Sequence, residues 1–200
     1  MCGIVGYTGK KQAAPILLDG LAKLEYRGYD SAGVCVFGDH EWQISKTKGR
    51  LAALQELTAN GTALHGTAGV GHTRWATHGA PSHTNSHPQV STNGKISLVH
   101  NGIIENYLYL REFLLAHGKT FVSETDTEVA ANLLEYLYEE TGDLLTAARR
   151  AVEMLEGSYA FGILCIDCPG RILAVKKDSP LIFGFGEGEN FIASDVTAIL

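Results

Sequence analysis

The sequence predicts an α+β fold, in which helices and strands are grouped into layers instead of alternating strictly along the chain. Segments whose apolar residues recur at helical spacing are expected to be helices, and short apolar runs bounded by turn signals are expected to be strands. Three expected helices follow one another directly, and a series of short strands comes after them. This grouping favours a layered domain over a doubly wound parallel sheet.

In the first half of the chain, strands surround two expected helices. Apolar residues recur at helical spacing from Ala14 to Leu24, and Pro15 is tolerated because it lies near the start of that helix. A polar turn at residues 38–40 separates two strands. The expected strands cover residues 2–7, 33–37, 42–46 and 68–73, and the expected helices cover residues 14–24 and 51–57.

The second half begins with a long loop, residues 75–94, which is rich in Gly, Pro, Ser, Thr, Asn and His. Loops of this length inside a compact domain are usually functional. Gly118 is typical of the residue that follows a helix, and Thr125 with Glu128 fits a capping box. The expected helices cover residues 107–117, 126–140 and 144–155, and the expected strands cover residues 96–100, 159–166, 171–175, 181–183 and 191–193.

Composition narrows the class of protein. The 200 residues suffice for one large domain or two small ones, and the formal charge of −6 without a long basic run argues against nucleic acid as the main partner. Four cysteines are too few for a disulfide-stapled scaffold. The N-terminus lacks the features of a secretory signal, and no apolar run reaches membrane-spanning length. We therefore expect a cytoplasmic protein that does not bind membranes.

Cys2 is a candidate N-terminal nucleophile. Removal of Met1, which is common before a small second residue, gives Cys2 a free α-amino group with a pKa of about 7.7–8.0. That amine can accept the thiol proton, so one residue supplies both nucleophile and general base. Gly3 allows close approach of substrate or backbone. The alternative is a buried structural cysteine at the start of an edge strand, and Cys2 alone does not decide between them.

Four further segments carry more polar chemistry than packing requires. They are LEYRGYDSAG (24–33), GHTRWATHGAPS (71–82), HNGIIENY (100–107) and ETDTE (124–128). Together with CGIVGY at the N-terminus, and in this order, they resemble the glutaminase domain of the glutamine–fructose-6-phosphate amidotransferases, also called glucosamine-6-phosphate synthases. The resemblance covers essentially all 200 residues. It implies an N-terminal nucleophile hydrolase fold, a four-layer α-β-β-α sandwich of two antiparallel sheets.

The resemblance also implies how glutamine is held. Arg74 is expected to bind the α-carboxylate through a bidentate fork, and Thr77 and His78 to add contacts to the same group. Asp126 is expected to bind the α-ammonium. An acidic residue in the first turn of a helix is also favoured by the helix dipole, so Asp126 has a structural explanation that can coexist with substrate binding.

The remaining catalytic candidates are Asn101, Gly102 and Arg27. Asn101 and Gly102 are expected to follow a strand and begin a turn, and their side-chain and backbone N–H groups can donate to a tetrahedral oxyanion. A simple Asn-Gly hairpin turn is the alternative. The resemblance makes this pair the oxyanion hole, places Arg27 beside the cysteine, where it orders the site, and gives Trp75 a role in closing over glutamine and gating the exit of ammonia.

Three other patterns are discounted. The histidines of residues 72–87 match no strong zinc spacing, so we expect no metal, and no cofactor is implied. Cys165 and Cys168 form a C-x-x-C without a second pair, and Cys165 fits a core position on a strand. Residues 184–188 lack the Lys-Ser/Thr ending of a phosphate loop and fit a hairpin turn.

The prediction is therefore a class II glutamine amidotransferase domain over residues 1–200, truncated at its C-terminal end. Its substrate is L-glutamine. Fructose 6-phosphate is expected to bind only to C-terminal sugar isomerase domains, which are absent here, and the full-length enzyme is expected to be a homodimer that makes glucosamine 6-phosphate. Another class II amidotransferase, serving purine, asparagine or glutamate synthesis, is one alternative. A catalytically silent glutamine-binding module, which retention of Met1 would produce, is the other.

Overall fold

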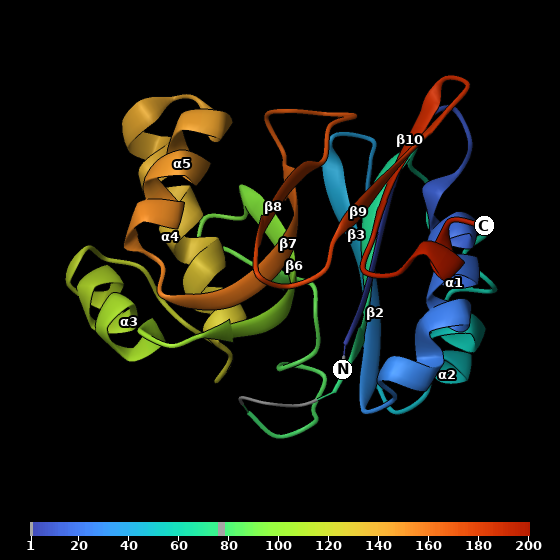
Figure 1. Ribbon diagram of the computed structural model, residues 1–200, viewed down its shortest axis with the longest axis horizontal. Coiled ribbons are helices and arrows are strands. Elements are labelled where there is room, and N and C mark those ends of the chain that lie inside the picture. The colour runs from blue at the N-terminus through green and yellow to red at the C-terminus, as the bar shows by residue number, and fades with distance from the viewer. Residues whose placement is uncertain (1, 76–78) are drawn as a thin grey trace.

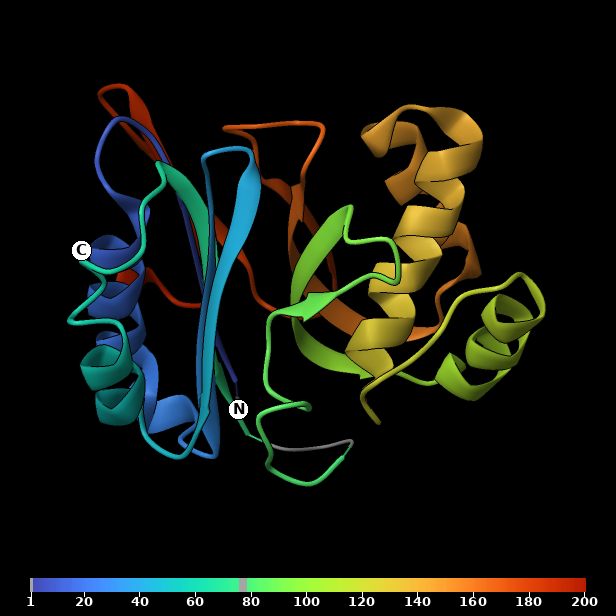
Figure 2. The ribbon, with the colours of Figure 1, turned by 180° about the vertical axis from the view of Figure 1, so that it is seen from behind.

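Two antiparallel sheets packed face to face form the centre of the molecule, and helices cover both outer faces (Figures 1 and 2). The computed structural model describes residues 2–75 and 79–200, and in these residues the sheets have six and four strands. The expected four-layer α-β-β-α sandwich is confirmed. No helix in these two ranges is long and apolar enough to cross a membrane.

The six-stranded sheet has the order β3-β2-β4-β1-β10-β9, with every neighbouring pair antiparallel. Its outer face is covered by α1 and α2, whose leucines pack against valines of the sheet in one buried cluster. The strands are β1 (Gly3–Thr8), β2 (Ser31–Gly38), β3 (Glu41–Lys48), β4 (Ala68–Arg74), β9 (Ile182–Gly186) and β10 (Glu189–Ala193). The helices are α1 (Ala13–Leu24), α2 (Leu51–Leu57) and the short 3₁₀ turns η1 (Glu25–Arg27) and η2 (Val196–Ala198).

The four-stranded sheet has the order β5-β6-β7-β8 and carries three helices on its outer face. Thr125 caps α4 by accepting the backbone N–H of Glu128 at 3.2 Å, as the capping signal predicts. The strands are β5 (Gln89–Val90), β6 (Ile96–Ile104), β7 (Gly157–Cys165) and β8 (Leu173–Lys177). The helices are α3 (Tyr107–Ala116), α4 (Asp126–Thr141) and α5 (Leu144–Met154).

The inner faces of the two sheets meet in an apolar layer, here called the inter-sheet core. Period-2 alternation along the strands selects its members. They are Ile4, Cys35, Val70, Val99, Ala160, Leu164, Leu181 and Ile192. Cys165 points to the opposite face of β7 and is buried beneath the helices, so its predicted core position is confirmed.

One expectation is wrong at a functional position. Asn101 and Gly102 do not begin a turn, because β6 continues to Ile104 and pairs them with Ala160 and Tyr159 of β7. The Asn-Gly signal is overridden by this long-range pairing. Gly102 is required there for another reason: its φ is +122°, and a Cβ would lie 2.0 Å from the carbonyl oxygen of Ser158. The two-residue strand β5 lies within the segment expected to be loop.

Candidate active site

The site forms where three strands change from apolar to chemically functional residues at the same end of the sheet sandwich. On β4, the residues on the inner face are Val70, then His72, then Arg74. On β1 the inner residue Ile4 is followed, toward the N-terminus, by Cys2. The antiparallel register pairs Gly3 with Thr73, so Cys2 and Arg74 are brought to the same edge although 71 residues separate them.

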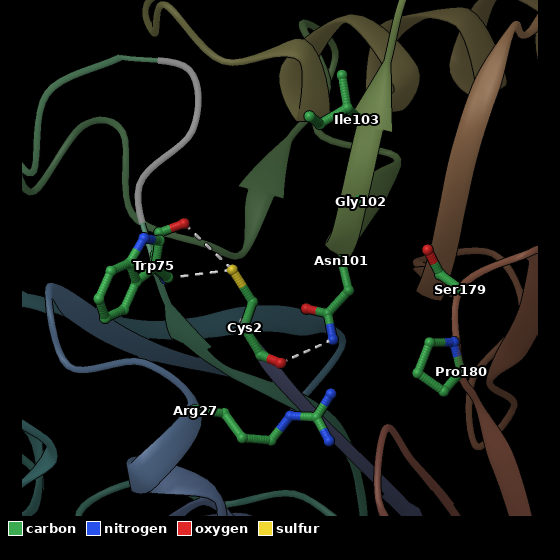
Figure 3. Close-up of a pocket in the computed structure, with 8 residues that line it drawn as sticks. All are labelled: Cys2, Arg27, Trp75, Asn101, Gly102, Ile103, Ser179 and Pro180. Atoms are coloured by element: carbon green, nitrogen blue, oxygen red, sulfur yellow. Dashed lines mark hydrogen bonds between the residues drawn. The ribbon is translucent and has the colours of Figure 1, made fainter.

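Cys2 is held by the backbone of Trp75 (Figure 3). The N–H of Trp75 donates to Sγ at 3.1 Å, and the thiol lies 3.4 Å from the Trp75 carbonyl oxygen, to which it donates. Burial raises the pKa of the Cys2 thiol, while the Trp75 N–H and the charge of Arg74 act in the opposite direction. The thiol therefore needs a base to become a thiolate at neutral pH.

A cavity of about 390 Å³ opens beside this thiol. It combines a nucleophile, hydrogen-bond donors and a wall contributed by Ser179 and Pro180, which lie between β8 and β9 (Figure 3). The lining residues are Cys2, Arg27, Trp75, Asn101, Gly102, Ile103, Ser179 and Pro180. All four predicted catalytic residues and Trp75 are thus brought together.

Asn101 reaches the nucleophile from the opposite sheet. Its amide Nδ2 donates to the carbonyl oxygen of Cys2 at 3.0 Å, and its Oδ1 lies 3.0 Å from Nε2 of His72. Asn101 follows Val99 on the inner face of β6, in the same way that Cys2 follows Ile4 on β1. An amide NH2 has two hydrogens, so one bond to Cys2 leaves the second for a ligand in the cavity.

A narrow crevice shares Cys2, Trp75 and Gly102 with this cavity and contains opposite charges. Arg74 is 3% exposed and donates from Nη2 to the carbonyl oxygen of Gly79 at 3.0 Å. Asp126 is also 3% exposed, lies in the first turn of α4 and accepts the Ile104 N–H through Oδ2 at 2.9 Å. The crevice residues are Cys2, Arg74, Trp75, His87, His100, Gly102, Asp126 and Thr127.

Arg27 and Trp75 complete the cavity lining. Nη1 of Arg27 makes an ion pair with Oδ2 of Asp195 at 3.1 Å, which ties η1 to the segment that follows β10. Trp75 is 48% exposed and packs edge to face on Tyr29, with ring centroids 5.6 Å apart. Two residues predicted to bind the glutamine carboxylate, Thr77 and His78, lie outside the described residues.

The burial of a histidine cluster next to the site was not predicted from the sequence. His72 was expected on a strand and His87 in the long loop, and neither was expected to be buried, but both are, and their ring centroids lie 4.2 Å apart. Thr127 bridges His87 and His100 with hydrogen bonds of 3.1 and 3.0 Å. Strand alternation through His72 and Arg74 was the available signal. Within 2–75 and 79–200, no group of three or more His, Cys, Asp or Glu residues is arranged to hold a metal ion.

Comparisons with known proteins agree with this geometry. Residues 58–200 match the sequence profile of the glutamine amidotransferase domain. The chain is 60% identical to the glutamine–fructose-6-phosphate aminotransferase (isomerizing) of Caldanaerobacter subterraneus and 58% identical to that of Clostridium tetani, over 100% of this chain and 32% of each relative. It therefore spans about a third of the length of these relatives.

A solved structure shares the fold. The glutamine phosphoribosylpyrophosphate amidotransferase of B. subtilis superposes with a TM-score of 0.82 and 26% identity, over 99% of this chain and 43% of that protein. The resemblance drawn from the sequence motifs is confirmed by these relatives. The profile match covers well over half of the chain, and the fold is that of a solved amidotransferase. The chain belongs to the glutamine amidotransferase domain family.

Proposed function

We propose that this domain hydrolyses the side-chain amide of glutamine with Cys2 as nucleophile, and that a longer enzyme uses the ammonia to convert fructose 6-phosphate into glucosamine 6-phosphate. One observation carries the proposal: Sγ of Cys2 and the amide of Asn101 face one cavity, while Arg74 and Asp126 line the crevice next to it. The relatives' names support fructose 6-phosphate as the acceptor.

The proposed reaction starts with proton transfer from the Cys2 thiol to its own α-amino group, which is free only after Met1 is removed. Sγ then attacks the amide carbon, and the electron pair of the C=O bond moves to oxygen. The NH2 of Asn101 and the backbone N–H of Gly102 donate to this oxyanion. When the intermediate collapses, the C–N bond breaks and nitrogen takes the proton from the α-amino group, releasing ammonia and a γ-glutamyl thioester. Water then hydrolyses the thioester to glutamate.

Charge complementarity supports the substrate. Free glutamine carries one carboxylate and one ammonium, and the crevice carries one guanidinium and one carboxylate. Arg74 is proposed to bind the carboxylate, with Thr77 and His78, and Asp126 to bind the ammonium. Arg27 orders the site and Trp75 gates ammonia in this proposal. Both residues line the cavity with Cys2.

We also propose how this domain belongs to a longer enzyme. We propose that residues 1–200 are the glutaminase unit of the longer enzyme, because the similarity to the aminotransferases covers all of them. A homodimeric full-length enzyme and a cytoplasmic location stay predictions of the sequence analysis. The identity to the sugar aminotransferases, 60%, against 26% to the phosphoribosylpyrophosphate enzyme, favours the sugar acceptor over purine synthesis.

The decisive experiment uses mass spectrometry with a glutamine-analogue electrophile. The intact mass shows whether Met1 has been removed, and peptide mapping after labelling locates the adduct. The processed chain is expected to carry one adduct on Cys2 and to hydrolyse glutamine. The matched control inserts a lysine between Met1 and Cys2, which keeps the methionine and blocks the amine, and it is expected to do neither. An adduct elsewhere, or equal turnover by the control, would contradict the proposal.

A further inference from the structure

His72 lies between the two sheets, next to Asn101, and is not used by the mechanism above. It is located on β4, opposite Ile4 of β1 and Gly33 of β2, and its side chain crosses to β6 of the other sheet. The residue is fully buried. Its Nε2 lies 2.9 Å from the carbonyl oxygen of His100 and 3.0 Å from Oδ1 of Asn101.

These two contacts determine where the imidazole proton is. A backbone carbonyl oxygen can only accept, so Nε2 must carry the hydrogen that is directed at His100. Nδ1 is then the unprotonated nitrogen, and among the residues that the structure describes it has no hydrogen-bond partner. Burial lowers the pKa of His72 to about 3, against the hydrogen bonds to Asn101 and His100, which raise it. The ring is therefore neutral at physiological pH.

The tautomer of His72 acts together with the Cys2 carbonyl, which accepts from Nδ2, in orienting the Asn101 amide. A 180° rotation of a carboxamide exchanges its oxygen and nitrogen at almost no steric cost, so the orientation depends on the partners. The single Nε2–H is shared between two acceptors, the carbonyl oxygen of His100 and Oδ1 of Asn101, so Oδ1 faces His72 and the NH2 faces Cys2. The reverse orientation would present a carbonyl oxygen to the developing oxyanion, which would repel it.

We propose that His72 is a positioning residue for the oxyanion hole: its Nε2–H, anchored on the carbonyl of His100, selects the Asn101 amide orientation that presents NH2 to the reacting carbonyl. This inference rests on the proposed role of Asn101. It concerns the transition state, because the oxyanion exists only after attack. Loss of His72 therefore lowers kcat and leaves KM for glutamine nearly unchanged.

A matched pair of substitutions tests the position of the donor. In His72→Gln the side-chain amide reaches about as far from Cα as Nε2 does, whereas in His72→Asn it ends near the position of Nδ1. His72→Asn is expected to lower kcat about 10- to 100-fold, less than the roughly 10²- to 10³-fold cost of removing an oxyanion donor because Asn101 is misoriented and not deleted, and His72→Gln to stay within about 5-fold of wild type. Equal loss in both variants, or no loss in His72→Asn, overturns the proposal.

A double-mutant cycle separates this proposal from the one on which it rests. If His72 acts through Asn101, His72→Asn is expected to cause less than about a twofold further loss in an Asn101→Ala background. A full additional loss shows that His72 acts by another route. If Asn101→Ala alone keeps wild-type kcat, the proposed oxyanion hole is wrong. If Asn101→Ala loses activity while His72→Asn does not, only the role of His72 is wrong.

Two measurements keep the test valid if a variant is poorly folded. Alkylation of Cys2 by iodoacetamide forms no oxyanion, so His72→Asn is expected to react at the wild-type rate, and a parallel loss of alkylation contradicts the proposal. In the unmutated protein, ¹⁵N NMR of labelled histidine is expected to show the neutral Nε2–H tautomer for His72. Detection of the Nδ1–H tautomer or of imidazolium at neutral pH overturns it.

Discussion

Two cysteines on inner sheet faces illustrate how position determines chemistry. Cys35 lies in the inter-sheet core on β2, opposite Val70, and burial raises the pKa of its thiol to about 12. Cys2 lies where the same space reaches the end of the strands, and it receives the Trp75 N–H and the field of Arg74. The inner residues of β4 change from Val70 to Arg74 within four positions, so the apolar and polar regions are parts of one continuous layer. Residue type alone does not separate the two cysteines, but distance from the end of the sandwich does.

The largest expected difference is in turnover. Cys2→Ala is expected to lower glutaminase kcat more than about 10³-fold, because it removes the nucleophile. Cys35→Ala is expected to stay within about twofold of wild type, because an inert buried thiol acts only through packing. Steady-state ammonia release, with circular dichroism to verify folding, measures both. Comparable losses in the two variants would mean that the inter-sheet core takes part in the chemistry.

The next largest effect is expected in substrate affinity, at Asp126. Asp126→Asn is expected to raise KM for glutamine about 10- to 100-fold, since a charge-assisted bond to the ammonium is lost. An asparagine oxygen can still accept the Ile104 N–H, so the melting temperature is expected to change little. Glutamine saturation curves and thermal unfolding measure the two effects.

Asp143→Asn provides the control for Asp126. Asp143 also begins a helix, accepts the Thr146 N–H at 2.8 Å, and is exposed outside the crevice. It is expected to leave KM unchanged. A near-normal KM in Asp126→Asn would assign Asp126 to the helix start alone, whereas raised KM in both variants would indicate a general electrostatic effect.

Acid is expected to lower the free energy of unfolding through His72. In the folded chain the pKa of His72 is about 3, whereas in the unfolded chain it is about 6.5. The unfolded state binds more protons between these values, so the free energy of unfolding falls as pH decreases from about 6.5 toward 3. From pH 7.5 to 5.5, His72 alone is expected to remove roughly 1.3 kcal/mol.

Urea unfolding of wild type and His72→Gln at both pH values isolates this contribution, because His87, whose pKa burial also lowers, is present in both proteins. Wild type is expected to lose roughly 1.3 kcal/mol more than the variant over this interval. Parallel losses would show that His72 is not the titrating group.

The smallest effect is expected in the apolar region. Ile192 lies in the inter-sheet core and is 4% exposed. Ile192→Val is expected to cost about 1 kcal/mol of stability through the lost methylene and the space it leaves, with kcat and KM unchanged. Urea unfolding and glutamine kinetics distinguish this from the Asp126 and His72 variants. A changed kcat would show that packing in the inter-sheet core affects catalysis.

Much of this protein was predictable from local sequence. Amphipathic spacing predicted all five α-helices found in the described residues to within a few positions, and Thr125 with Glu128 predicted the start of α4. Five ordered motifs were sufficient to identify the amidotransferase family, since each carries chemistry that packing does not require. Five of the residues that line the cavity were predicted from these motifs, whereas Ile103, Ser179 and Pro180 were not.

Tertiary structure decided what depends on partners distant in the sequence. Only the pairing of β1 with β4 brings Cys2 to the backbone of Trp75, and only the pairing of β6 with β7 extends the strand through Asn101 and Gly102. Burial of His72 and its contact with Asn101 also require both sheets. Local propensity describes single segments, whereas these contacts depend on strand register and on the desolvation that the sandwich imposes, so they became visible only in the folded chain.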